Sequence, residues 1–151
     1  KKARLNLSYP TLQKALQDID PEQLTPELVS KAVCEIRSSK LPDPGVIGNA
    51  GSFFWNPIVS EDELKRLQHA HPDIAAYPYR NQYKIAAAWL IDKAGWTGYR
   101  EGDVGVHKDH ALVLVNYGAA TGAQLFNLSE RIQASVAKKF GIKLQPEVRI
   151  I

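Results

Sequence analysis

The stretch Ala111–Gly141, ALVLVNYGAATGAQLFNLSERIQASVAKKFG, contains the clearest strand and the clearest helix of the chain. Its first residues, Ala111–Val115, are continuously apolar and rich in valine and leucine, which is typical of a central strand covered on both faces. Thr121 and Gln124 then have the spacing of a capping box, which marks the start of a helix. Apolar residues recur at helical spacing up to Gly141, whose conformational freedom suits a helix C-terminus.

Further helices and strands alternate along the rest of the chain. Thr25 and Ser60 predict helix starts, because their side chains can accept bonds from free backbone amides. An apolar run predicts another helix over Ile85–Ala94, ended by Gly95. The remaining predictions are a short helix at Thr11–Asp18, strands at Ala3–Tyr9, Ser52–Trp55, Ile142–Leu144 and Val148–Ile151, a loop at His71–Asn81 and a turn-rich link at Gly98–Gly105. Helices interspersed with strands indicate an α+β fold, with helices packed on a mixed β-sheet.

The composition limits the classes of protein to which the chain can belong. Its 151 residues suffice for one compact domain, and 44% hydrophobic with 23% charged residues is ordinary for a folded protein. The net charge is +3, but the basic residues are scattered along the sequence. The interpretation as an RNA-binding domain would therefore depend on the pI near 9.0 alone, and no nucleic acid is expected as a partner. The longest apolar run, Ile85–Ile91, is far shorter than the ~20 residues of a membrane span, so no membrane partner is expected. Without paired cysteines or a secretion signal, a cytoplasmic location is expected.

Glycine and proline are concentrated between Lys40 and Ser52. Glycine is costly in a simple connector, because it loses more backbone freedom on folding than other residues, so the stretch suggests a close approach of the backbone to a ligand. It lacks the Gly-Lys-Ser/Thr of a phosphate-binding loop and the spacing of a dinucleotide fingerprint. The residues alone leave two roles open for Ser52: a hydrogen bond to local backbone, which is the more common, or chemistry on a ligand.

Several blocks of sequence resemble the UDP-N-acetylenolpyruvoylglucosamine reductase family. They occur in the family's order and extend over essentially the whole chain, which makes the resemblance highly specific. The blocks are Lys40–Pro44, Gly48–Phe54, Asn56–Pro57, Ala87–Asp92, Val106–His107, Ala111–Asn116 and Pro146–Arg149. One departure is Trp55, which stands where a charged residue is expected in familiar relatives.

The resemblance implies a cytoplasmic flavoenzyme of bacterial peptidoglycan synthesis. Such an enzyme reduces UDP-N-acetylglucosamine enolpyruvate to UDP-N-acetylmuramate, with NADPH as the reductant and FAD as the bound cofactor. The resemblance further implies that residues 1–41 end the FAD-binding region, that 42–142 form the substrate-binding domain, and that 143–151 form a closing strand returning toward an N-terminal FAD-binding domain. The glycine-rich loop of that domain is not found in this sequence, so the domain would be a partner and this chain alone is expected to be inactive.

The resemblance also assigns roles to individual residues. Ser52 corresponds to the family's proton donor, which protonates the carbanion left by hydride transfer, and Glu147 corresponds to its catalytic carboxylate. Tyr77 corresponds to a tyrosine on a mobile loop that closes over the substrate. The expected substrate-binding residues are Tyr9, Lys40, Asn56, Tyr77 and His110. His107 and His110 could suggest a metal site, but no further ligands cluster near them in the sequence, so no metal is expected. The alternative is a non-catalytic module that binds UDP-sugars.

Overall fold

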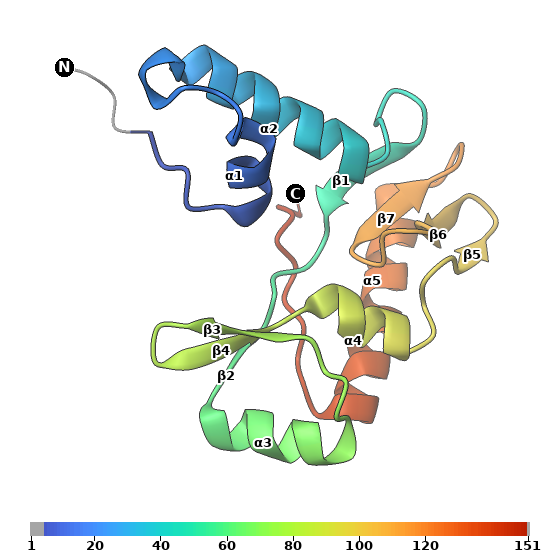
Figure 1. Ribbon diagram of the computed structural model, residues 1–151. Coiled ribbons are helices and arrows are strands. Elements are labelled where there is room, and N and C mark those ends of the chain that lie inside the picture. Colours follow the sequence, from blue (N-terminus) through green and yellow to red (C-terminus); the bar gives the residue numbers. More distant parts are fainter. Residues whose placement is uncertain (1–4, 151) are drawn as a thin grey trace. The chain divides into compact units, whose positions relative to one another are not determined.

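The structure of the chain is a computed structural model that describes residues 5–150 (Figure 1). The chain divides into two compact units, Lys1–Asp43 and Pro44–Ile151. Helices and antiparallel sheets are both present, so the predicted α+β class is confirmed. Within residues 5–150, no helix is both long and apolar enough to cross a lipid bilayer.

The first unit contains helix α1 (Pro10–Leu16), a short 3₁₀ turn η1 (Pro21–Gln23) and helix α2 (Pro26–Lys40). Both predicted helices are therefore confirmed, and the Thr25 hydroxyl accepts a hydrogen bond from the Leu28 amide at 3.2 Å, as expected of an N-cap. A small core of Leu12, Leu16 and Ala32 holds the helices together.

The strand predicted over Ala3–Tyr9 is wrong where the structure describes it, because residues 5–9 are not in a strand. Ala3 and Arg4 lie outside the described residues. The physical reason is local: the Asn6 side chain accepts bonds from both the amide and the hydroxyl of Ser8, at 3.1 and 2.7 Å. Such short-range bonds give the backbone an alternative to pairing in a sheet.

The second unit contains two antiparallel sheets. The first has the order β1-β7-β6-β5, and the second has the order β2-β4-β3. Their strands are β1 (Gly48–Ser52), β2 (Ile58–Val59), β3 (Ala76–Tyr79), β4 (Gln82–Ile85), β5 (Arg100–Glu101), β6 (Val104–Val106) and β7 (Val113–Asn116). All strand pairs described in residues 5–150 are antiparallel, so the expected mixed sheet is not found. The predicted central strand is confirmed as β7, which lies between β1 and β6 with its apolar residues buried.

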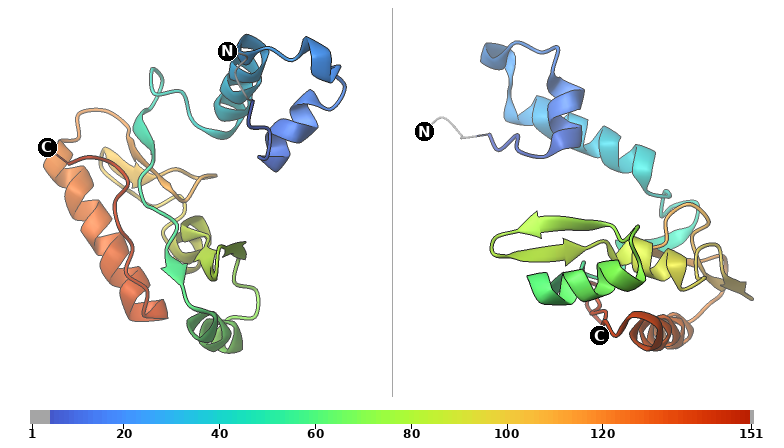
Figure 2. Two further views of the ribbon diagram at one scale, coloured as in Figure 1. Left: turned by 90° about the vertical axis from the view of Figure 1, so that its left-hand side faces the viewer. Right: turned by 60° about the horizontal axis from the view of Figure 1, so that its bottom comes forward.

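Three helices cover this unit: α3 (Glu61–Ala70), α4 (Ala87–Lys93) and α5 (Gly122–Phe140). The Ser60 hydroxyl accepts a bond from the Glu63 amide at 3.2 Å, and Thr121 forms the complete capping box with Gln124. Helix α5 ends at Gly141 with φ 71°, as predicted. It packs against β6, β7 and α4, as the two views of Figure 2 show. The fully buried residues at these contacts include Leu90, Ile91, Leu128, Ile132 and Val136.

Two β-hairpins stand where loops were expected. β3 and β4 form one of them, with Tyr79 paired to Gln82, in place of the predicted loop and the first residue of the predicted helix. β5 and β6 form the other, with Glu101 paired to Val104. Tight two-residue turns make these hairpins possible, since Arg80 and Gly102 both adopt positive φ, of 54° and 59°.

The C-terminal segment is extended but forms only one bridge, between Pro146 and Phe54. The strands predicted at Ile142–Leu144 and, over its described residues 148–150, at Val148–Ile151 are therefore wrong. The amides of Trp55 and Glu147 make the two bonds of this bridge, to the carbonyls of Gln145 and Phe53. The Phe53 amide donates instead to the carbonyl of Leu112, so the pairing does not extend into a ladder. The predicted strand Ser52–Trp55 is displaced: β1 ends at Ser52, and Phe54 continues only as the bridge partner of Pro146.

Candidate functional site

The end of β1 positions Ser52 through a break in the regular strand. Asn49 and Ser52 both pair with β7, but the register shifts between them, which is the signature of a β-bulge. Gly51 adopts φ 74° at this point, and the Asn49 side chain accepts a hydrogen bond from its amide at 2.9 Å. A Cβ placed on Gly51 would meet no atom within 4 Å, so glycine is needed here for its backbone conformation rather than for space.

Ser52 and Glu147 line the same cavity, of about 620 Å³. Ser52 is near the start of the second unit's sequence and Glu147 is near its end, and backbone hydrogen bonds hold the two segments together. The amide of Glu147 donates to the carbonyl of Phe53 at 2.8 Å, and the amide of Phe53 donates to the carbonyl of Leu112 at 2.7 Å. The adjoining residues, Pro146 and Phe54, form the isolated β-bridge of the C-terminal segment. The structure therefore places a serine and a glutamate in the lining of one cavity.

Asn56 lines the same cavity and also supports a helix. Its side-chain oxygen accepts a hydrogen bond from the Ala87 amide, in the first turn of α4, at 2.9 Å. This bond fixes the orientation of the side-chain amide, because the oxygen is engaged with the helix. The NH₂ group is then the part of Asn56 that can donate to a ligand in the cavity.

Two lysines that the sequence analysis did not single out, Lys84 and Lys143, also line the cavity. The ammonium group of Lys84 lies 4.0 Å from the ring centroid of Tyr79, another lining residue, which is a cation–π contact. Among the ion pairs between described residues, none includes Lys84 or Lys143. These lysines give the cavity a positive potential that favours anionic ligands.

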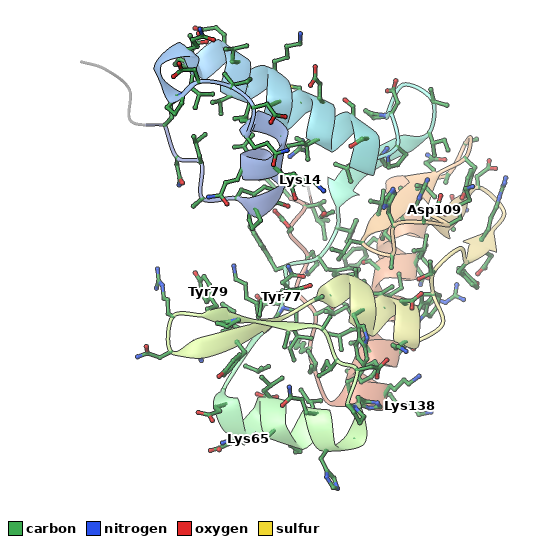
Figure 3. The ribbon with its side chains drawn as sticks, in the orientation of Figure 1. Lys14, Lys65, Tyr77, Tyr79, Asp109 and Lys138 are labelled. Atoms are coloured by element: carbon green, nitrogen blue, oxygen red, sulfur yellow. The ribbon has the colours of Figure 1, made fainter. Side chains whose placement is uncertain are left out.

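Tyr77 lies on strand β3 and is 61% exposed. The expectation of a loop at this position is corrected, because Tyr77 pairs with Lys84 in the hairpin. Figure 3 shows Tyr77 and Tyr79 on the same strand, two residues apart and thus on the same face. Tyr79 lines the cavity, whereas Tyr77 is not among the described lining residues.

His110 lies in the connection between β6 and β7, stacked on His107 with ring centroids 4.9 Å apart and an angle of 16°. Burial, followed by the nearby His110, lowers the pKa of His107 below its usual value. His110 is not among the described residues that line the cavity, but its carbonyl accepts a bond from the Val113 amide and so shapes the turn before Leu112. In the part of the chain that the structure describes, no group of three or more His, Cys, Asp or Glu could hold a metal ion.

Tyr9 and Lys40 belong to the first unit. Tyr9 is the N-cap residue of α1, and its side chain is 58% exposed. Its carbonyl accepts hydrogen bonds from the amides of Leu12 and Gln13. Lys40 is the last residue of α2. The structure thus brings Ser52, Asn56 and Glu147 together in one cavity, with Tyr77 and His110 elsewhere in the same unit.

A cavity lined by apolar residues and by two lysines, on an α+β scaffold, suits the binding of a small anionic molecule. Comparison with known families identifies the family of this domain. Residues 43–151 match the family described as UDP-N-acetylenolpyruvoylglucosamine reductase, C-terminal domain. The chain therefore belongs to the UDP-N-acetylenolpyruvoylglucosamine reductase family.

Curated relatives with that same protein name are similar over nearly the whole chain. A protein of Pseudomonas fluorescens is 53% identical over 146 residues, which are 96% of this chain and 43% of the relative. One of Pseudomonas aeruginosa is 50% identical over 97% of this chain and 44% of its own length. One of Chromobacterium violaceum is 48% identical over 100% of this chain and 45% of its own length. The chain thus spans less than half the length of these relatives.

Proposed function

We propose that the complete protein reduces UDP-N-acetylglucosamine enolpyruvate to UDP-N-acetylmuramate for peptidoglycan synthesis in the cytoplasm. NADPH would be the reductant and FAD the bound cofactor. Membership of the reductase family supports this function. The observation that carries it is the convergence of Ser52 and Glu147 in one cationic cavity, although they are 95 positions apart in the sequence.

Ser52 is proposed to deliver the proton in this reaction. The remainder of the complete protein would hold the FAD, which would be the source of a hydride for the terminal carbon of the enolpyruvyl group. The neighbouring carbon, next to the carboxylate, then carries negative charge and needs a proton. A serine hydroxyl is a weak acid, but transfer to so basic a carbon is feasible when the hydroxyl is held within hydrogen-bond reach. The bulge at Gly51 supports this role, because it fixes where β1 ends and Ser52 begins to face the cavity.

Glu147 is proposed to polarise the enolpyruvyl group while charge develops on it. Its backbone is held by the bond to Phe53, so Glu147 belongs to the same cavity lining as the proton donor. Lys84, Lys143 and the NH₂ group of Asn56 are proposed to bind the phosphate and carboxylate oxygens of the substrate. Tyr9, Lys40, Tyr77 and His110 are proposed as further substrate contacts in the complete protein.

The described residues do not by themselves suit a flavin. A dinucleotide cofactor usually binds to free backbone amides of a glycine-rich turn at a helix N-terminus. Here the glycine-rich stretch Gly48–Ser52 is a β-strand that pairs with β7, and no helix follows it directly. We therefore assign FAD to the remainder of the complete protein. In this proposal residues 1–41 end the FAD-binding region, 42–142 bind the substrate, and 143–151 return toward the FAD-binding domain.

Replacing Ser52 by alanine in the complete protein tests the proposed proton donor. We expect turnover to fall by about 10²–10⁴-fold, which is the usual contribution of a positioned acid. The rate of flavin reduction by NADPH should be unchanged, since that half-reaction does not use the proton. Stopped-flow absorbance and steady-state assays measure the two rates separately.

Two outcomes of this experiment contradict the proposal. Turnover at the parent rate in Ser52→Ala would show that the proton comes from another group. If the complete parent protein binds the UDP-sugar but shows no turnover, the chain belongs instead to a non-catalytic binding module.

A further inference from the structure

Trp55 lines the cavity, and the proposed function gives it no role. Its side chain is 55% exposed, although indole gains more from burial than most side chains. The other two tryptophans contact aromatic rings, Trp89 on Phe140 and Trp96 on Tyr99. Among the described residues, no aromatic ring is paired with Trp55, which instead lines the cavity beside Ser52.

The backbone at Trp55 is held in place. Its amide donates to the carbonyl of Gln145 at 2.9 Å, and the preceding residue, Phe54, is only 1% exposed and forms the bridge to Pro146. Pro57 restricts the chain two residues further on. An exposed ring on such a fixed segment is ready to contact a ligand with little loss of backbone entropy on binding.

The position of Trp55 along the wall indicates which part of a ligand it would meet. In the proposed function Ser52 acts at the reacting end of the substrate, and Lys84, which pairs with Ile58 between β2 and β4, is one of the proposed anion-binding residues. Trp55 comes midway in the chain between Ser52 and Ile58, at most about 10 Å from each, because even a fully extended chain rises only ~3.3 Å per residue. In a UDP-N-acetylglucosamine derivative, the sugar ring lies between the enolpyruvyl ether and the diphosphate.

We propose that Trp55 stacks against the N-acetylglucosamine ring of the substrate and thereby selects a sugar nucleotide over a free nucleotide. This inference rests on the proposed function. The C–H groups on one face of a pyranose ring carry partial positive charge, and they complement the negative face of indole. The contact also covers apolar surface of both partners, which makes it favourable in water.

Binding to the full-length protein tests this assignment, with UDP-N-acetylglucosamine and UDP as the two probes in isothermal titration calorimetry. Trp55→Ala is expected to weaken binding of UDP-N-acetylglucosamine by about 10-fold and to change binding of UDP by less than about 2-fold. Trp55→Phe keeps an aromatic face and is expected to retain most of the affinity. Phe126→Ala is the matched control, because Phe126 is a 39% exposed aromatic residue on α5 that is not among the lining residues.

Three outcomes would overturn the inference. Equal losses for both probes in Trp55→Ala would mean that the ring contacts the nucleotide rather than the sugar. Unchanged affinity for both would mean that Trp55 does not contact the ligand. In either case the proposed function stands, provided that the parent protein binds both probes. If the parent binds neither probe, the role of Trp55 fails, and turnover of UDP-N-acetylglucosamine enolpyruvate decides separately whether the proposed function stands.

Discussion

Gly51 determines how β1 delivers Ser52 to the cavity, and its left-handed backbone gives the first prediction. Gly51→Ala should destabilise the protein by about 1–2 kcal/mol, because an L-residue at φ 74° brings its Cβ too close to the following carbonyl. The loss of stability should come from backbone strain alone, since a Cβ at Gly51 would meet no other atom within 4 Å. Urea unfolding followed by circular dichroism measures the change.

Gly122 provides the control for Gly51. It is the first residue of α5, where a Cβ would also meet no atom within 4 Å, but its φ is not positive. Gly122→Ala should therefore stabilise the protein slightly, by about 0.5 kcal/mol, by restricting the unfolded chain. Equal free energies of unfolding for the two variants would refute the strain at Gly51.

The stacked pair of histidines predicts how stability changes with pH. The pKa of His107 is lowered in the folded protein, first by burial and then by His110, whereas the unfolded chain has the usual value near 6.5. Below that value the unfolded chain binds the proton more readily than the folded protein does. Stability is therefore lost as the pH falls through 6.5, until the lower folded pKa is passed.

His107→Asn should remove this loss of stability. The free energy of unfolding of the variant should therefore change less than that of the parent between pH 7.5 and pH 5.5. Chemical denaturation at both pH values measures the difference. His69→Asn, at an exposed residue in the last turn of α3, serves as the control and should keep the parent's pH dependence. The same dependence in His107→Asn as in the parent would exclude His107 as its source.

At the scale of elements, the capping box of α5 gives a prediction about a whole helix. Thr121→Ala removes the hydroxyl that accepts from the Gln124 amide at 3.3 Å and should cost about 1 kcal/mol of stability. Glu130→Ala, at an exposed residue within the same helix, should change stability by less than about 0.5 kcal/mol. Thermal unfolding of both variants compares them directly, and equal midpoints would mean that the cap does not stabilise the helix.

The helices were predictable because their signals are local. The caps at Thr25, Ser60 and Thr121 and the terminal Gly141 each mark a boundary that the structure confirms. The hairpin formed by β3 and β4 was not predicted, because Pro78 and the polar residues around its turn obscure the alternation of a strand. The C-terminal strands were predicted from apolar residues alone. They are absent because the pairing stops at one bridge, where the Phe53 amide bonds to the carbonyl of Leu112 instead of continuing a ladder with the C-terminal segment.

The candidate site was predictable only in part. Resemblance to a family singled out Ser52, Asn56 and Glu147, and the structure places all three in one cavity. Their roles remain proposals. Lys84 and Lys143 were missed, because a lysine in a short polar segment has no local pattern that separates it from a solvated surface residue. Only long-range pairing, of Lys84 with Ile58 for example, reveals that such residues share a cavity.

At the scale of the whole molecule, the cavity is built by segments that are remote in sequence. It belongs to the second unit, where the end of β1, the hairpin of β3 and β4 and the C-terminal segment meet. The matched family region, residues 43–151, covers nearly the same residues as this unit. The chain spans less than half of its relatives' length, so the proposed reaction requires residues from the remainder of the complete protein.

The single bridge between Phe54 and Pro146 has a consequence for protein synthesis. The two residues are 92 positions apart (146 − 54 = 92), and every helix and strand of the second unit after β1 lies between them. A ribosome therefore completes α5 before it makes the residues that close the cavity. Until then the cavity lacks three of its lining residues, Lys143, Gln145 and Glu147, and a nascent chain arrested at Gly141 would have an incomplete site.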